Sequence, residues 1–592
     1  MWDLPWNLMF LLSAAGYILL LNRRYRIAVE FTPALYCSIC VCVLLAAGIL
    51  NFLLEATVVF TAAGVICFGI YAKQIPKLSR REWGILAIFG GVLLYLLALL
   101  GKTYLTNYDV YSHWGVVVRQ MLLNDRVPNV SDKVVNFKSY PLGSSLWIYY
   151  FCRVNCFGDG MFAFAQQVMQ VSFLLPVLAW VKKENRYLAF LPAVYFLYGM
   201  VSNVSVNNLQ VDSLLPVMAV GVFAAAAYYR NEPHKGILCG APMLVLLLQV
   251  KSSAIYFAAV YWVWAVWCWR RDLRHNKKIA CEFMSWNVAA PLAGMLIWMR
   301  HVSLVFGDEI TNKHAVSLKN YSYTFSEKTA ADISLVVKRA IQSAFQVENG
   351  TFWLMILLTA GLLVLLGICR FSGKSGRKIL ELIGANWAIF VTYLIGLCGM
   401  YLFSMPQGEA DRLESFARYF QTCGVFLLGL NVLCLLDWGE EISTGRRSAA
   451  AAVCLAVVLF SFWNPADGAY RFPEATRELV KRGSDQPAPL EIMRASLENY
   501  GYLEENARYG IYQGTNDNDY TYFLLRYETG EELVSLLEGP ESLQGGLEPL
   551  AQDYDYLLIW EPDEISDRVL AEYGLADSCG IQGVIVNLMT YQ

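Results

Sequence analysis

Residues 56–72 read ATVVFTAAGVICFGIYA, a run of 17 residues without a charged side chain. Residues 6–21 and 448–463 are equally apolar and also carry no charge. A helix that crosses a bilayer needs about 20 largely apolar residues. These runs therefore predict helices that span a membrane.

The composition of the whole chain supports the same fold class. The 592 residues are 57% hydrophobic and 16% charged, whereas soluble domains carry about 25% charged residues. This composition excludes an all-soluble protein, a disordered chain and a small disulfide-rich scaffold. We expect an α-helical polytopic, multi-pass membrane protein.

Fourteen segments are apolar enough to be predicted spans. They lie at residues 5–21, 31–51, 55–72, 83–101, 160–180, 186–202, 212–229, 236–251, 253–269, 285–305, 351–369, 380–404, 418–436 and 448–464. The first has no basic n-region and no cleavage site, so it is predicted to be a retained helix rather than a signal peptide. Residues 1–464 form the predicted transmembrane domain.

Charge divides the chain into two parts. Residues 465–592 carry a net charge of −16 and the remainder +13. The acidic part is long enough to form its own core. Because strand-like and helix-like runs alternate in it, we expect a soluble α/β domain. Its predicted strands are residues 509–512, 520–527, 556–560 and 583–588, and its predicted helices are residues 491–503 and 530–537.

Lys and Arg in the short loops orient the predicted spans. Alternate loops are basic, as in Arg23-Arg24 and Arg270-Arg271, and basic loops face the cytoplasm. Both termini and the acidic domain are then extracytoplasmic, at the cell (plasma) membrane. The long outer loops are residues 102–159, 306–350 and 406–417, and their length favours a functional role.

The first outer loop carries candidate site residues. Apolar residues at 114, 117, 118, 121 and 122 recur with helical spacing, which predicts an interfacial helix anchored by Trp114. Asp109 precedes this helix, and is either its cap or a carboxylate acting on a substrate at headgroup level. His113 is either an interfacial polar anchor or a site residue that acts as a proton carrier or a ligand.

Further charged residues are predicted at the outer ends of spans. Asp212 either complements a helix dipole or is a second site carboxylate. Lys251, Arg300 and Arg418 each either contact lipid headgroups or belong to a site, since charges at membrane depth are costly and usually functional. Together these cations can bind a phosphate, Arg as a bidentate fork and Lys as a point charge.

Three motifs resemble those of C-type (GT-C fold) membrane glycosyltransferases, in particular bacterial members of uncharacterised function. Residues 109–115 (DVYSHWG) are similar to an Asp-Glu-Phe-Ser-His-Trp-Gly motif, with Val110 where the relatives have an acid. Residues 140–143 (YPLG) resemble Tyr-Pro-Pro-Gly, and residues 415–419 (SFARY), ending in Arg418 and Tyr419, resemble Ser-Phe-x-Arg-Tyr. The resemblance covers roughly residues 1–465.

The resemblance implies an activity and its partners. Such enzymes transfer a sugar from a polyprenyl-phosphate donor to a cell-envelope glycan, lipid or protein at the outer face. Asp109 would be the general base of an inverting displacement, and Arg418, with Lys251 or Arg300, would stabilise the leaving lipid phosphate. A transporter or flippase of lipid-linked glycans, or a polysaccharide polymerase or ligase, are the alternatives. We expect no nucleic-acid partner.

No cofactor or metal site is predicted, and a divalent-metal requirement is left open. Asp517 and Asp519 either bind calcium or belong to a solvated turn, since the EF-hand spacing is absent. Cys152 and Cys156 are predicted outside, where they are either paired or free.

Overall fold

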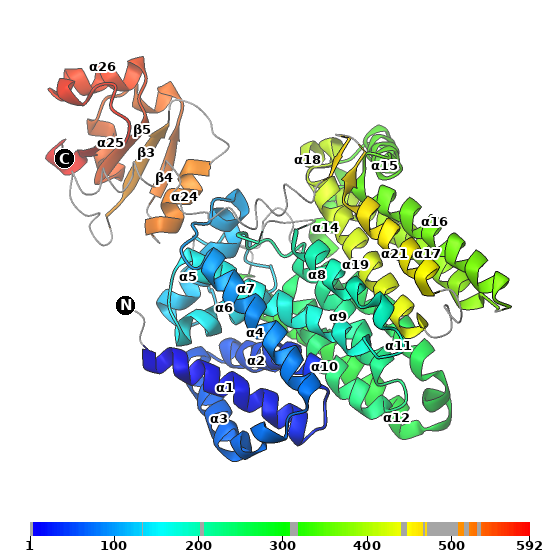
Figure 1. Cartoon of the computed structure of the whole chain (residues 1–592). Helices are drawn as coiled ribbons and strands as arrows, with labels where there is room; N and C mark the ends of the chain where they lie inside the picture. The colour runs from blue at the N-terminus through cyan, green and yellow to red at the C-terminus, as the bar shows by residue number, and fades with distance from the viewer. Residues whose placement is uncertain are drawn as a thin grey trace. The chain divides into compact units, whose positions relative to one another are not determined.

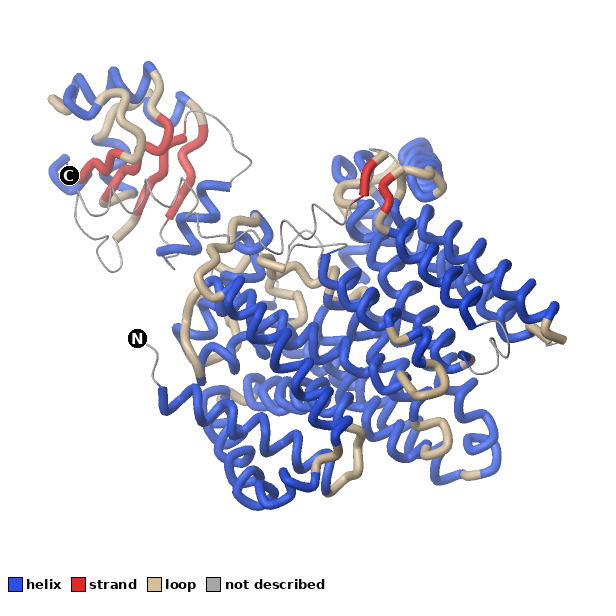
Figure 2. Tube along the Cα trace, in the orientation of Figure 1, coloured by secondary structure: helices blue, strands red, loops and turns tan. Residues whose placement is uncertain are grey.

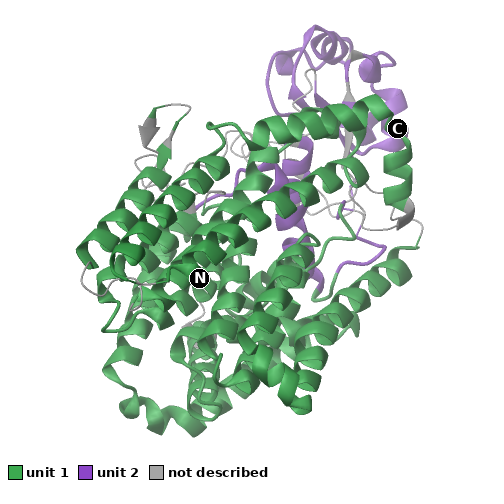
Figure 3. Ribbon diagram, turned by 90° about the vertical axis from the view of Figure 1, so that its right-hand side faces the viewer, with its two compact units in different colours: residues 1–101, 125–127, 137–482 green, residues 102–124, 128–136, 483–592 purple. Residues whose placement is uncertain are grey.

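The computed structural model (Figure 1) describes residues 4–132, 134–201, 206–307, 318–373, 375–439, 447–465, 468–470, 507–513, 520–529 and 534–591. The chain divides into two compact units, coloured separately in Figure 3. The first unit contains residues 1–101, 125–127 and 137–482. The second contains residues 102–124, 128–136 and 483–592. Most of the first outer loop therefore folds with the C-terminal residues.

The first unit is a bundle of helices. These are α1 (Leu4–Arg23), α2 (Thr32–Ile49), α3 (Leu53–Tyr71), α4 (Arg80–Leu100), α6 (Gly143–Val154), α7 (Asp159–Leu174), α8 (Phe190–Val201), α9 (Leu214–Tyr228), α10 (Pro233–Val250), α11 (Ala254–His275), α12 (Lys277–Glu282), α13 (Ala290–Phe306), α14 (Leu318–Ser326), α15 (Ala330–Ala344), α16 (Gly350–Phe371), α17 (Arg377–Phe403), α18 (Gln407–Arg412), α19 (Phe416–Asp437) and α21 (Arg447–Ser461). A short antiparallel hairpin, β1 (Trp463–Asn464) and β2 (Ala469–Tyr470), follows α21.

Described helices lie at all fourteen predicted spans. Nine helical segments of the described chain are long and apolar enough to cross a membrane, and three shorter apolar helices include α9 and α21. The mostly helical, multi-pass character expected from the sequence is thus confirmed. The number of spans and their orientation remain predictions.

Small residues bring α1 and α3 into close contact. A Cβ atom on Gly16 would lie 1.9 Å from the carbonyl oxygen of Gly64, and one on Gly64 would lie 2.1 Å from Ser13 Oγ. Small residues at such interfaces let membrane helices approach each other closely. By contrast, α4 buries few of its side chains, and α7 buries almost all of them.

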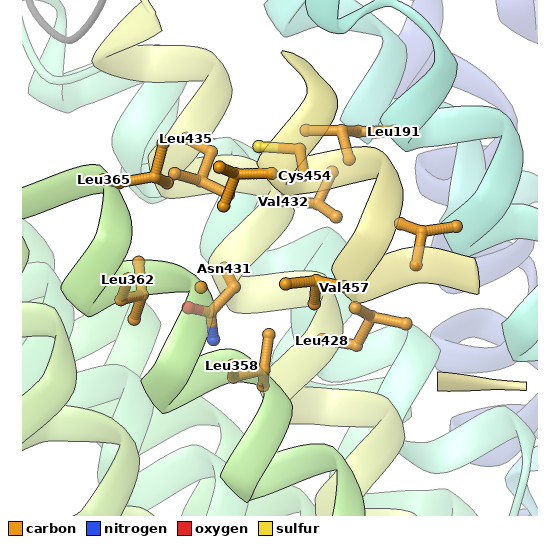
Figure 4. Close-up of a pocket in the computed structure, with 13 residues that line it drawn as sticks. Leu191, Leu358, Leu362, Leu365, Leu428, Asn431, Val432, Leu435, Cys454 and Val457 are labelled. Carbon is orange, nitrogen blue, oxygen red and sulfur yellow. The ribbon is translucent and has the colours of Figure 1, made fainter. Parts of the chain in front are cut away.

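An apolar pocket lies between α8, α16, α19 and α21 (Figure 4). Asn431 of α19 is its polar lining residue. The Asn431 and Asn386 side-chain amides, both 1% exposed, donate hydrogen bonds to each other at 3.0 and 3.1 Å. Polar side chains join helices in this way within membranes, so this pair ties α17 to α19.

The second unit contains a four-stranded sheet with the order β4-β3-β5-β6, drawn in red in Figure 2. Its elements are α5 (Gly115–Asn124), β3 (Tyr509–Gln513), α24 (Tyr520–Thr529), β4 (Val534–Glu538), α25 (Glu548–Asp553), β5 (Tyr556–Glu561), α26 (Glu564–Glu572) and β6 (Val584–Asn587). Strand β3 pairs in parallel with β4 and β5, and β6 is antiparallel to β5. One face of the sheet packs on a core that includes Leu543, Leu570 and Leu588.

Two sequence predictions for this unit are wrong. Residues 520–527, predicted as a strand, belong to helix α24. Residues 534–537, predicted to end a helix, belong to strand β4. The strands predicted at residues 509–512, 556–560 and 583–588 are present. The predicted helix at residues 491–503 lies outside the described residues.

Candidate functional site

Three helix ends meet at one end of the first unit. Asp212 lies two residues before α9, Lys251 directly follows α10, and Arg418 is in the first turn of α19. The chain enters α19 through two non-glycine residues in the left-handed conformation, Leu413 (φ 52°) and Ser415 (φ 58°). Such residues cost free energy and persist where the surrounding structure imposes them, often near functional sites.

The three charged side chains form one group. Lys251 Nζ donates a hydrogen bond to Asp212 Oδ1 at 2.7 Å, and Arg418 Nε lies 3.7 Å from Asp212 Oδ2. Each carboxylate oxygen of Asp212 therefore faces a different cation. We call Asp212, Lys251, Arg418 and Tyr419 the cation cluster.

Tyr419 packs beneath both cations of the cluster. Its ring centre lies 4.7 Å from Lys251 Nζ and 5.1 Å from the guanidinium carbon of Arg418. Attraction between a cation and an aromatic face contributes about 0.5–2 kcal/mol, more when the pair is desolvated. Thr422, one turn further along α19, donates a hydrogen bond to the Asp212 carbonyl at 3.2 Å. Asp212 is thus held both through its carboxylate and through its backbone carbonyl.

The cluster has a net charge of +1 because two cations share one carboxylate. The side chain of Asp212 is only 7% exposed, whereas those of Lys251 and Arg418 are 22% and 24% exposed. The carboxylate is therefore covered, while part of the side-chain surface of Lys251 and of Arg418 remains accessible. This distribution suits an anionic ligand, since Arg and Lys are the side chains that proteins commonly use to bind phosphate.

Lys251 is held in its charged form. Burial lowers the pKa of its amine, but attraction by Asp212 and Tyr419 and the hydrogen bond to Asp212 outweigh burial and raise the pKa above the ordinary value. Repulsion by Arg418 opposes this rise. The amine is consequently an ammonium group at physiological pH.

Arg300 is placed elsewhere. It lies on α13 and is exposed. Within the described residues, the ion pairs of the cluster join Asp212 to Lys251 and to Arg418 and do not include Arg300. Its neighbour His301 stacks on Trp298 with ring centres 5.5 Å apart. The structure therefore brings together Asp212, Lys251, Arg418 and Tyr419, but not Arg300.

Asp109 and His113 belong to the second unit. The Asp109 side chain, half-buried, makes no capping hydrogen bond to the π-helical turn Val110–Trp114 that follows it. That turn leads directly into α5, so a helix is present where the sequence predicted one. Trp114, predicted as a membrane-surface anchor, is 7% exposed, because the turn directs it inward.

His113 is buried and neutral. Its residue is 4% exposed, and loss of hydration lowers the pKa of the imidazole from 6.5 to about 3. The ring meets Trp114 edge to face, with centres 4.6 Å apart. At neutral pH this imidazole therefore carries no charge.

The described residues contain no group of three or more His, Cys, Asp or Glu side chains that could hold a metal ion. Asp517 and Asp519 lie outside those residues. None of the fifteen cysteines, Cys152 and Cys156 included, forms a disulfide in the structure.

Sequence reasoning missed α24, which packs against the turn after Asp109. Tyr111 of that turn contacts Tyr520 and Tyr527 of α24 with ring centres 5.6 and 5.3 Å apart. The helical spacing of the aromatic residues at 520, 523 and 527 was the available signal.

No protein-family model matches the chain, and a search of curated proteins gives no significant match.

Proposed function

We propose that the protein is a membrane glycosyltransferase of the GT-C type that transfers a sugar from a polyprenyl-phosphate donor. The observation that carries this proposal is the cation cluster, in which one covered carboxylate holds two partly accessible cations at the ends of apolar helices. Such an arrangement suits a ligand with a phosphate attached to a long apolar tail. Membrane lipids that carry a sugar phosphate have this chemistry.

In the proposed mechanism the cluster binds the lipid phosphate. Arg418 donates hydrogen bonds to phosphate oxygens, and the Lys251 ammonium group adds a second positive charge. Negative charge on the phosphate grows as the bond to the sugar breaks, so both cations stabilise the transition state more than the ground state. Asp212 orients them, because it binds one with each oxygen.

Asp109 is the proposed general base. It takes the proton from an acceptor hydroxyl while that oxygen forms a bond to the anomeric carbon. The bond from the anomeric carbon to the phosphate oxygen breaks at the same time, and the lipid phosphate leaves with the electron pair. This single displacement inverts the anomeric centre. The acceptor is a cell-envelope glycan, lipid or protein.

The reaction takes place at the outer face of the membrane in this proposal. Both termini, the outer loops and the C-terminal sheet lie on the extracytoplasmic side of the plasma membrane, as the basic loops predict. Donor and acceptor therefore meet at the outer leaflet.

A transfer assay tests the proposal. Purified protein in proteoliposomes is given a panel of radiolabelled polyprenyl-phosphate sugars and membrane acceptors, beside Asp109→Asn. We expect wild type to transfer one sugar with inversion, and the variant to lose about 100-fold or more of the rate. Equal transfer rates for wild type and the variant would show that Asp109 is not the general base. Movement of the intact lipid-linked glycan between leaflets without transfer would favour a flippase, and extension of a lipid-linked glycan by another glycan would favour a polymerase or ligase.

A further inference from the structure

Residues 102–124 and 128–136 of the first outer loop fold with the C-terminal domain. They belong to the same compact unit as residues 483–592 (Figure 3). Tyr104 packs on the face of the sheet formed by Tyr509, Ile511 and Trp560. The loop is thus attached to the sheet before the chain reaches Asp109.

Helix α24 holds the segment on both sides of Asp109. Before it, the Tyr520 hydroxyl donates a hydrogen bond to the Thr106 carbonyl at 3.1 Å. Tyr108 meets Phe523 edge to face, with ring centres 5.3 Å apart. After it, Tyr111 packs between Tyr520 and Tyr527.

Gly115 allows the closest approach. A Cβ atom at this position would lie 2.8 Å from the ring of Tyr527. Real Cβ atoms do not approach other atoms this closely, so the glycine is needed for the turn to pack on α24.

Arg119 of α5 makes a further set of contacts with helix α24. Its guanidinium donates a hydrogen bond to the Glu528 carbonyl at 2.7 Å, and a second nitrogen lies 3.8 Å from the Glu528 carboxylate. The guanidinium carbon also lies 5.0 Å from the centre of the Tyr527 ring. Both partners of the ion pair are less than one quarter exposed, so this contact is more than a solvated surface pair.

We propose that α24 positions Asp109, with Arg119 and Glu528 as positioning residues. The inference rests on the proposed function, since it explains how a general base on a long loop keeps its geometry. Ordering a free loop costs about 1–2 kcal/mol of backbone entropy per residue, and a misplacement of about 1 Å can cost about 100-fold in rate. The packing against α24 supplies that order before any substrate binds.

Charge reversal tests the inference. The variants are Arg119→Glu, Glu528→Arg and the double variant, with Glu572→Arg as a charge-matched control, because Glu572 is exposed on α26 of the same unit. We expect each single variant to lower kcat about tenfold or more while the donor KM stays near the wild-type value. The double variant should recover part of the kcat lost by Arg119→Glu, because the ion pair reforms with reversed sign but the hydrogen bond to the carbonyl of residue 528 does not.

Hydrogen–deuterium exchange of residues 105–121 gives a readout that needs no activity. The single variants should exchange faster there and the double variant more slowly than either. Unchanged kcat in single variants whose loop exchanges faster would overturn the positioning role, as would a fall in kcat with no change in exchange. Absence of transfer by wild type would instead refute the proposed function, so the two failures are distinguishable.

Discussion

Replacing Arg418 by methionine removes one of the two cations that we expect to bind the lipid phosphate. Lys251 already donates a hydrogen bond to Asp212 at 2.7 Å, so the variant retains a Lys–Asp ion pair with no net charge. A charge-assisted hydrogen bond contributes about 1.5–3 kcal/mol, and 1.4 kcal/mol is about tenfold in affinity. We therefore expect Arg418→Met to weaken polyprenyl-phosphate binding about 10- to 150-fold.

Asp212→Asn should act in the opposite direction. The cluster then has a charge of +2, so lipid phosphate should bind more tightly at pH 7. The folded protein should lose about 2 kcal/mol of stability, less than for a fully buried pair because both cations are partly exposed.

Displacement of a radiolabelled polyprenyl phosphate from protein in nanodiscs measures both effects. Arg412→Met is the matched control, because Arg412 is exposed in the same loop region. The reasoning is refuted if Arg418→Met binds within about twofold of wild type, or if Asp212→Asn weakens binding as much as Arg418→Met does. The second outcome would mean that the cluster is a purely structural ion network.

Three further predictions concern other parts of the fold. Because the folded pKa of His113 is about 3, its contribution to stability is complete above pH 6.5 and declines as pH falls toward 3. Hydrogen exchange in α5 should therefore show that the free energy of unfolding falls by about 2 kcal/mol from pH 7 to pH 5 in wild type but not in His113→Gln. An equal fall in the variant would contradict the assignment to His113. Gly143→Ala would place a Cβ atom 2.6 Å from the Gln249 carbonyl, so we expect thermal unfolding in detergent to show a loss of about 1–3 kcal/mol. Gly91→Ala, which adds its Cβ atom in open space inside helix α4, should not lower stability; equal melting temperatures for Gly143→Ala and wild type would show that the contact relaxes freely. Asn386→Ala should cost about 1–2 kcal/mol in the same assay, and adding Asn431→Ala should cost little more, whereas additive losses would mean that the two amides act independently.

Much of the helical architecture was predictable because hydropathy acts locally. A described helix lies at every predicted span, since a bilayer requires backbone hydrogen bonds to be satisfied within each segment. Hydropathy cannot show which helices lie deep in the bundle. The almost complete burial of α7 and the exposure of α4 depend on packing between segments far apart in the sequence.

The C-terminal region shows where local reasoning fails. The aromatic residues of 520–527 have high strand propensity, yet the segment is helical. As a helix it places Tyr520, Phe523 and Tyr527 toward the aromatic side chains of the first outer loop. Those partners are about 400 residues earlier in the chain, so no window of the local sequence contains them.

The candidate site was predicted in part. The cost of placing a charge at membrane depth singled out Lys251 and Arg418, and the structure joins both to Asp212. The same argument applied to Arg300, which lies exposed on α13 outside the cluster. The free-energy cost of a charge at membrane depth does not distinguish a cation that faces a carboxylate from one that faces solvent or lipid headgroups. Tyr419 was a candidate site residue only through the resemblance of residues 415–419, and the structure adds its contact with both cations.

The most direct test is an experimental structure of the protein in nanodiscs with a bound polyprenyl-phosphate sugar. We predict phosphate oxygens within hydrogen-bond distance of Lys251 Nζ and the Arg418 guanidinium, with Asp212 still bound to Lys251. A phosphate bound elsewhere, with the cation cluster unchanged and empty, would contradict the account.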